Sequence, residues 1–104
     1  MRSFFVYILA NRLNSVLYIG VTNNLKRRLF EHRSKVNDGF SCRYQTTRLV
    51  FYEETSDVFA ALQREKELKG WRRSKKDHLI FSVNPHWNDL GEMLQFEDSS
   101  LRSE

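Results

Sequence analysis

The sequence has little cysteine and no long run of hydrophobic residues. Its 104 residues include one cysteine, Cys42, which excludes an internal disulfide framework and any zinc or iron–sulfur site built from several cysteines. No apolar run approaches the roughly 20 residues that a membrane-spanning helix needs, and the opening stretch MRSFFVYILAN leads into strand-like sequence instead of a cleavage site. We therefore expect no export signal, no membrane segment and a reducing, cytoplasmic location.

The chain is also too short for two domains, which commonly need roughly 100 to 150 residues each. It is 40% hydrophobic, with eight Phe, four Tyr and two Trp, which is enough for one packed core. Residues 1–90 carry 16 Lys and Arg against 9 Asp and Glu, whereas residues 91–104 carry one against four. We expect one domain over residues 1–90 and an acidic, flexible or partly helical tail over residues 91–104. The basic body favours a polyanionic partner, although a basic surface also serves solubility alone.

Hydrophobic patterning predicts a hairpin followed by a helix. Residues 4–9 and 16–19 are β-branched and aromatic runs joined by a polar, turn-forming stretch, which is typical of a β-hairpin. After Gly20, residues 22–24 offer side chains that can cap a basic helix. The apolar residues of this helix fall on one stripe: Leu25, Leu29 and Val36.

The second half of the domain is predicted to contain a strand and two more helices. Residues 37–47 include the turn signal Asp38-Gly39 and should form a loop that leads into a strand over 48–54. Ser56 or Asp57 can cap the next helix, which should end with Gly70 in the C′ position. Its apolar stripe consists of Val58, Ala61, Leu62 and Leu68.

The last predicted helix is short. Ser74 with Asp77 resembles a capping box at its start, and Pro85 marks its end. The residues expected to point inward are Leu79, Ile80 and Val83.

Glu65 is the most informative polar residue, because it falls inside the apolar stripe of its helix. Burying a carboxylate is costly unless it is paired or bound to a metal. Its position therefore fits two explanations equally, a ligand for a hard cation or a buried ion pair with an arginine.

Two further groups are candidates on local grounds. Arg28 and His32 are four residues apart and share a helix face, where both could meet a phosphate, although most such pairs are merely solvated. Tyr7 and Tyr18 lie in the paired strands, where a tyrosine is more often part of the core. Gly20 follows a strand and indicates a close approach that a side chain would block.

Taken together, Val6-Tyr7-Ile8, Tyr18-Ile19-Gly20 and the stretch from Thr22 to His32 resemble the GIY-YIG nuclease family. The resemblance covers residues 4 to about 90, and the segments 61–73 and 84–90 are similar to small, stand-alone bacterial members. It departs from the family pattern at the first triad, where Phe5 stands at the glycine position and Val6 at the isoleucine position.

The resemblance implies an α/β fold of the α+β type, a three-stranded antiparallel sheet flanked by helices. It implies an endonuclease, a phosphodiester hydrolase acting on DNA, including structured or branched DNA, with one Mg²⁺ or Mn²⁺ as cofactor. Repair, recombination, mobile-element biology and nucleic-acid turnover all fit such an activity. The oligomeric state is left open.

The resemblance also implies a role for each site residue. Tyr7 would be the general base or a base relay, and Tyr18 would hydrogen-bond the attacking water or a phosphate oxygen. Arg28 would contact the scissile phosphate, Glu65 would hold the divalent cation, and His32 would support the site. We take these further residues as nucleic-acid-binding candidates: Lys26, Arg27, Arg33, Lys35, Arg72, Arg73 and Asn84. Asn84 is explained nearly as well as a helix C-terminal residue before Pro85.

Two other functions compete with the nuclease. The first is a nucleic-acid-binding module that keeps the fold and basic surface but has little or no cleavage activity. The second is a structural or protein-interaction domain in which Trp71, Trp87 and the tail mediate assembly. The absence of any nucleic-acid binding would favour the second.

Overall fold

A computed structural model describes residues 2–34 and 43–92 of the chain. The bounds of its elements are β1 (Phe4–Ala10), β2 (Leu17–Thr22), α1 (Leu25–Ser34), β3 (Arg48–Thr55), α3 (Val58–Gly70) and α4 (Arg73–Val83). The expected Asp38-Gly39 turn, Val36 and Lys35 lie outside the described residues.

The three strands form one antiparallel sheet, as predicted, and their order is β2-β1-β3. The hairpin between β1 and β2 is closed by Asn11, whose side-chain oxygen accepts hydrogen bonds from the backbone N–H groups of Ser15 at 2.8 Å and Val16 at 3.2 Å. Asn14 adopts φ of 59°, a conformation that asparagine tolerates well in turns. The pairing of β1 with β3 shifts register between Ile8 and Leu9.

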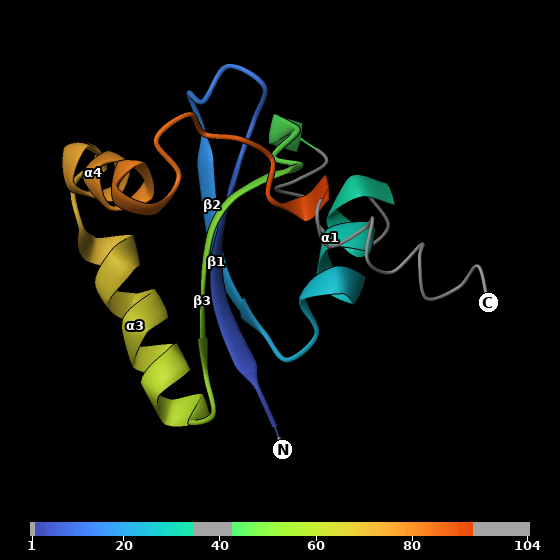
Figure 1. Cartoon of the computed structure of the whole chain (residues 1–104), viewed down its shortest axis with the longest axis vertical. Helices are drawn as coiled ribbons and strands as arrows, with labels where there is room; N and C mark the ends of the chain where they lie inside the picture. Colours follow the sequence, from blue (N-terminus) through green and yellow to red (C-terminus); the bar gives the residue numbers. More distant parts are fainter. Residues whose placement is uncertain (1, 35–42, 93–104) are drawn as a thin grey trace.

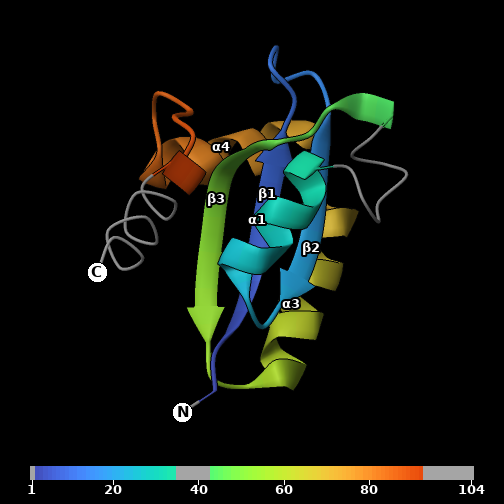
Figure 2. The ribbon, with the colours of Figure 1, turned by 90° about the vertical axis from the view of Figure 1, so that its right-hand side faces the viewer.

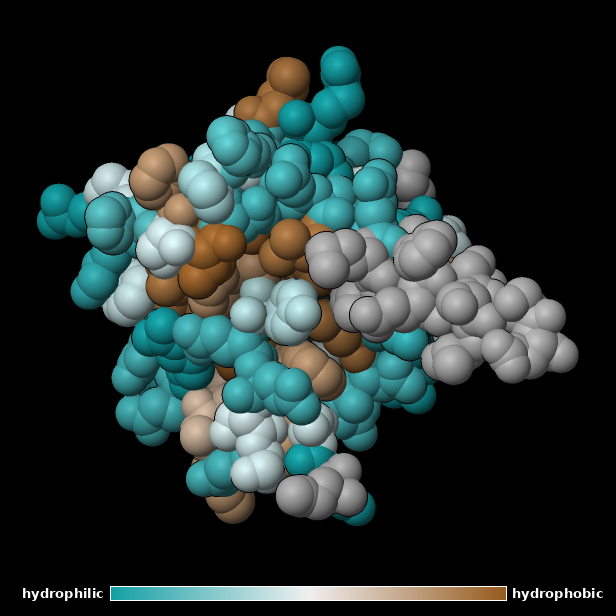
Figure 3. Space-filling view, viewed as in Figure 1, coloured by the Kyte–Doolittle hydropathy of each residue, from teal (hydrophilic) through white to brown (hydrophobic). Residues whose placement is uncertain are grey.

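Helices cover both faces of the sheet. Figure 1 shows the sheet edge-on, with α3 and α4 on one side and α1 on the other, and Figure 2 shows α1 in front of the strands. Because side chains alternate along a strand, β1 sends Val6 and Ile8 toward α3 and α4, and Tyr7 and Leu9 toward α1. Hydrophobic residues also gather in the middle of the face shown in Figure 3, between helices that are mostly hydrophilic outside.

Two predicted helix starts are confirmed and one is wrong. Asn24 accepts a hydrogen bond from the backbone N–H of Arg27 at 3.1 Å, and Asp57 accepts one from Phe59 at 2.9 Å. The expected capping box of Ser74 does not form, since α4 begins at Arg73 without a side-chain cap.

The expected C′ role of Gly70 is also wrong. Gly70 is the last residue of α3, its φ is not positive, and Trp71 is the C-cap. The chain leaves this helix in an extended conformation, which keeps Trp71 against the core and makes a left-handed residue unnecessary.

The predicted inward faces of α3 and α4 need two corrections. Ala61 and Leu68 are buried, but Leu62 is half exposed and Val83 is 62% exposed. The buried stripe of α3 and that of α4 are narrower than predicted, because each helix packs on the sheet along one line only.

Both tryptophans lie against the core and carry cations on their outer faces. The guanidinium of Arg64 and the ammonium of Lys75 lie 5.3 and 4.1 Å from the Trp71 ring centroid, and Arg73 lies 5.9 Å from that of Trp87. This arrangement accounts for Trp71 and Trp87 within the fold, so neither residue needs an assembly partner to explain it.

Asp89 joins the last described residues to α1 and β3. Its carboxylate accepts two hydrogen bonds from Arg33 of α1, at 2.8 and 3.0 Å, and one from the backbone N–H of Leu49 at 3.1 Å. The backbone N–H of Leu90 donates to the carbonyl of Leu49 at 2.7 Å. Among the helices described, none is both long and apolar enough to cross a bilayer.

Candidate active site

The sheet places Tyr7 directly opposite Gly20, on the face covered by α1. A Cβ atom at Gly20 would lie 2.6 Å from the Tyr7 hydroxyl oxygen, so only glycine leaves room for this phenol. The close approach expected at Gly20 is therefore present, and its cause is Tyr7. Tyr18 stands two residues before Gly20 on the same face, and its ring stacks on that of Tyr7 with centroids 6.1 Å apart.

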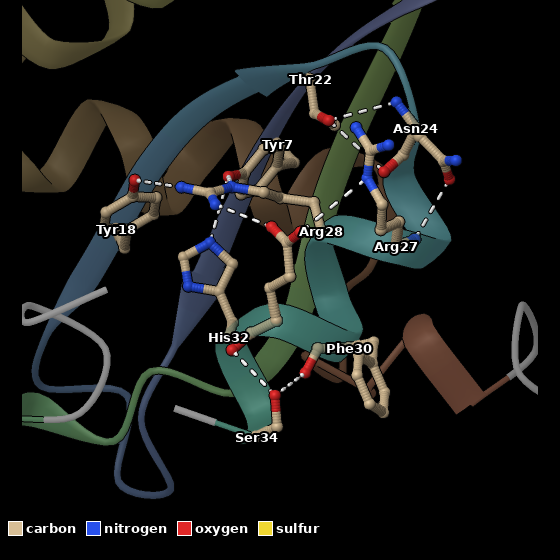
Figure 4. Close-up of polar contacts among 10 residues, drawn as sticks. Tyr7, Tyr18, Thr22, Asn24, Arg27, Arg28, Phe30, His32 and Ser34 are labelled. Atoms are coloured by element: carbon tan, nitrogen blue, oxygen red, sulfur yellow. Dashed lines mark hydrogen bonds and ion pairs between the residues drawn. The ribbon is translucent and has the colours of Figure 1, made fainter. Parts of the chain in front are cut away.

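Helix α1 contributes Arg28 and His32, one turn apart. Arg28 donates from Nε to the Tyr7 hydroxyl at 3.2 Å and from Nη2 to the Tyr18 hydroxyl at 3.5 Å. The Tyr7 hydroxyl is 3.1 Å from His32 Nε2. Figure 4 shows the Arg28 guanidinium between the two phenols, with the imidazole beneath it. The four residues form one connected cluster, which we call the Arg28 cluster.

Burial differs sharply within the Arg28 cluster. His32 and Tyr7 are 0% and 1% exposed, whereas the Arg28 side chain is 28% exposed. The His32 ring also packs edge-on against Tyr18, with centroids 4.8 Å apart. Arg28 and the half-buried Tyr18 therefore form the surface of the cluster, and Tyr7 and His32 form its floor.

The surroundings change the acidity of two members of the cluster. Burial raises the pKa of the Tyr7 phenol well above its ordinary value, and the nearby Arg28 only partly opposes this. Partial burial disfavours the charge of Arg28, but its hydrogen bonds to Tyr7 and Glu31 outweigh that effect and raise its pKa. At neutral pH the cluster thus holds a neutral phenol and a positive guanidinium.

Glu65 lies on α3 and is paired with a lysine instead of the arginine considered from sequence. Its carboxylate is 3.0 Å from the Lys69 ammonium, and the glutamate side chain is 21% exposed. Lys69 lines a pocket together with Tyr18, at the β2 edge of the sheet. Because α3 covers the face of the sheet opposite to α1, Glu65 lies outside the Arg28 cluster, and Lys69 lies at the edge between the two faces.

The Glu65 carboxylate fits a hydrated divalent cation better than a cation enclosed by protein. Within residues 2–34 and 43–92, no three His, Cys, Asp or Glu side chains gather closely enough to hold a metal among them. Mg²⁺ usually keeps several waters and takes one or two carboxylates plus phosphate oxygens. Glu65 offers one such carboxylate, which is half-buried and already pairs with a positive group, the Lys69 ammonium.

The remaining candidates from sequence lie in different surroundings. Arg27 is exposed and makes a long ion pair of 3.8 Å with Glu31, and Arg72 is the exposed N-cap of α4. Lys26 lines a separate pocket with Phe5 and Tyr52. None of these three is part of the Arg28 cluster.

Three other candidates bind parts of the fold. Arg33 is paired with Asp89 and also donates to the carbonyl of Thr47 at 3.0 Å, and Arg73 donates to hairpin carbonyls, including that of Ser15 at 3.2 Å. Asn84 is 4% exposed, and its amide nitrogen donates to the carbonyl of Val50 at 3.0 Å. Asn84 ends α4, which packs on the opposite face of the sheet from Tyr7.

Sequence reasoning passed over Lys69 and Lys76, which line the pocket beside Tyr18. The spacing of Lys69 four residues after Glu65 was a usable signal, because such pairs meet on a helix surface. Lys76 gave no such signal, since its approach to Tyr18 depends on how α4 packs.

Comparison with known proteins agrees with this arrangement. A family model described as the GIY-YIG catalytic domain matches residues 3–78. A UPF0213 protein of Natronomonas pharaonis is 34% identical over 76 residues, covering 73% of this chain and 88% of that protein. A UPF0213 protein of Staphylococcus haemolyticus is 36% identical over 84 residues, covering 77% of this chain and 96% of its own.

A solved structure shares the fold. The solution NMR structure of a UPF0213 protein from Bacillus halodurans superposes with a TM-score of 0.55 at 26% identity, over 84% of this chain and 92% of the other. The family model spans the strands that carry Tyr7 and Tyr18, helix α1 and all of α3. The chain belongs to the GIY-YIG family of nuclease domains, and within it resembles the small UPF0213 proteins.

Proposed function

We propose that this chain is a divalent-metal-dependent endonuclease that hydrolyses phosphodiester bonds in DNA, structured or branched DNA included. The observation that carries the proposal is the Arg28 cluster, in which a charged guanidinium joins two phenol hydroxyls above a buried imidazole. A basic protein surface and a family whose members are nucleases support a nucleic-acid substrate. The single cysteine fits a reducing cytoplasm.

Arg28 binds the scissile phosphate. Its guanidinium is the partly exposed member of the cluster and presents several donors in a plane, which suits two phosphate oxygens at once. Its raised pKa keeps the positive charge through the reaction, so it stabilises the negative charge that develops on the phosphoryl oxygens.

Tyr7 acts as a proton relay and not as a preformed phenolate, because its raised pKa keeps the phenol protonated at neutral pH. When Arg28 turns to the phosphate, the Tyr7 oxygen is freed to accept a proton from the attacking water. Tyr7 passes its own proton to Nε2 of His32, which is 3.1 Å away and must be the accepting nitrogen. Tyr18 holds the water or a phosphate oxygen at the outer rim.

Glu65 would hold the divalent cation. When bound, the cation supplies Lewis-acid stabilisation of the leaving oxygen. The hydroxide formed from water attacks phosphorus, the bond to the leaving oxygen breaks, and that oxygen takes a proton from solvent.

The experiment is cleavage of labelled duplex, branched and single-stranded DNA, and of RNA, with Mg²⁺ or Mn²⁺. Wild type is compared with Glu65→Ala and with Glu67→Ala, a matched control two residues along α3 that is 49% exposed. We expect cutting by wild type and by Glu67→Ala, with cutting lost in Glu65→Ala while binding persists. Equal cutting by all three proteins would refute the role of Glu65, and salt-sensitive binding without any cutting would identify a binding module instead.

A further inference from the structure

A pocket of about 280 Å³ lies at the β2 edge of the sheet. It is lined by Leu17, Tyr18 and Ile19 of this edge strand, by Lys69 of α3 and by Lys76 of α4. Because one water takes up about 30 Å³ of liquid, the pocket has room for a phosphate group with several waters. We call it the β2-edge pocket.

The β2-edge pocket is positively charged. Its polar lining includes two ammonium groups and no carboxylate. Lys69 is 57% exposed and paired with Glu65, while for Lys76 no ion pair is found in the described part of the chain. Two nearby cations are engaged elsewhere, since Arg73 is paired with Asp77 at 2.6 Å and Lys75 lies over Trp71.

Tyr18 connects the β2-edge pocket with the Arg28 cluster. Its hydroxyl is 3.5 Å from the Arg28 guanidinium, and the same residue lines the pocket beside Lys69 and Lys76. Tyr18 packs on the face of the sheet covered by α1, whereas Leu17 and Ile19 pack on the face covered by α3 and α4, so the pocket lies at the edge between the two faces. A strand that crosses this edge would bring one phosphate to the pocket while Arg28 holds another.

We propose that Lys69 and Lys76 bind a second backbone phosphate of the nucleic-acid strand whose scissile phosphate Arg28 binds. The proposal rests on the proposed function for its polyanionic ligand, and it assigns a phosphate site to two residues outside the Arg28 cluster. Neither residue reads the base, so the site positions the strand in any sequence.

Lys69 also couples this phosphate site to Glu65. Its ammonium occupies the carboxylate that a divalent cation would use, 3.0 Å away, so the cation and Lys69 compete for Glu65. Lys69 is one turn along α3 and long enough to turn from Glu65 to the pocket that it lines. Removing the lysine should make the carboxylate a stronger ligand for the cation and the pocket a weaker ligand for phosphate.

Nucleic-acid binding tests the phosphate site without depending on cleavage. Binding of a labelled DNA oligonucleotide is measured by fluorescence anisotropy without divalent ions, over a series of salt concentrations. Lys69→Met and Lys76→Met should each lower the slope of log Kd against log salt by about 0.7 to 0.9. Lys66→Met, an exposed α3 lysine that does not line the pocket, is the matched control and should keep the wild-type slope.

Mn²⁺ binding, followed by electron paramagnetic resonance of the protein alone, tests the coupling. Lys69→Met should bind Mn²⁺ more tightly than wild type and Lys66→Met, and Glu65→Gln should remove that gain. If the Lys69 and Lys76 variants keep the slope of the Lys66 variant, the phosphate site is wrong whether or not the protein cuts DNA. If the slopes fall but no substrate is cut, the phosphate site stands and the nuclease proposal fails.

Discussion

At the scale of single residues, Gly20 controls the position of Tyr7. A methyl group there would stand 2.6 Å from the phenol oxygen and 2.8 Å from the carbon that bears it. The φ of Gly20 is not positive, so the demand for glycine comes from this crowding and not from the backbone. The phenol must move if Gly20 gains a side chain.

We therefore expect Gly20→Ala to cut DNA much more slowly and to lose about 1 to 3 kcal/mol of stability, the usual cost of overpacking. Cleavage rates and urea unfolding measure the two effects. Gly70→Ala is the control, because a methyl there meets nothing within 4 Å and removes a glycine from a helix. A Gly20→Ala protein as active and as stable as wild type would contradict the tight fit.

Tyr7 also makes the fold sensitive to alkali. The folded protein raises the pKa of this phenol above the 10.0 of an ordinary tyrosine, so above that pH the unfolded chain loses the proton first. Stability should then fall as pH rises above about 10, by up to 1.4 kcal/mol per pH unit for this one proton. Urea unfolding across this range should show a shallower decline in Tyr7→Phe.

Tyr52→Phe is the control for this alkaline loss, because Tyr52 is 39% exposed whereas Tyr7 is buried. The stability of Tyr52→Phe should fall with rising pH as steeply as that of wild type. Parallel slopes in wild type and Tyr7→Phe would mean that Tyr7 is no harder to ionise in the folded protein than in the unfolded chain.

At the scale of elements, the strands and helix positions could be predicted from sequence, whereas the helix ends could be predicted only in part. Periodicity placed β1, β2, β3 and α3 because burial on one face leaves a regular pattern. Gly70 and Ser74 were misassigned because both junctions are set by packing: Trp71 stays on the core, and Arg73 is drawn to the hairpin carbonyls.

The candidate site, too, could be predicted from sequence only in part. Tyr7, Tyr18, Arg28 and His32 were named from a family pattern, and the structure joins them by hydrogen bonds and ring contacts. The ion pair of Glu65 with Lys69 lies within one helix, so the spacing of the two residues in the sequence could have predicted it. The approach of α4 to Tyr18 joins segments far apart in the chain, and local pattern carries no information on it.

The link between α1 and the C-terminal segment depends on Asp89. Asp89→Ala should destabilise the domain by about 1.5 to 3 kcal/mol, because it removes a charged partner of Arg33 and leaves the Leu49 N–H without its acceptor. Asp89→Asn keeps an acceptor oxygen and should lose less. Urea unfolding distinguishes the three proteins, and an unchanged midpoint in Asp89→Ala would show that the Arg33–Asp89 pair contributes nothing to holding α1 in place.

At the scale of the whole molecule, charge is distributed unevenly between residues 1–92 and residues 93–104. The described residues end at Glu92, whose backbone N–H donates to the Asp89 carbonyl at 3.2 Å. Residues 93–104 carry three acidic side chains against one arginine, so the net charge of +4 would become +6 without them. The basic residues and the acidic end of the chain thus occupy different parts of the sequence.

We accordingly expect a chain ending at Glu92 to unfold at the same urea concentration as the full chain and to bind DNA more tightly at low salt. The gain should shrink as salt rises, because the screening length falls from about 30 Å at 0.01 M to about 8 Å at 0.15 M. A full-length protein with Glu97→Gln, Asp98→Asn and Glu104→Gln separates charge from length and should bind like the shortened chain. A lower unfolding midpoint in the shortened chain would mean that the folded domain extends beyond Glu92, and equal DNA affinity at low salt would mean that the acidic residues lie too far from the bound strand to repel it.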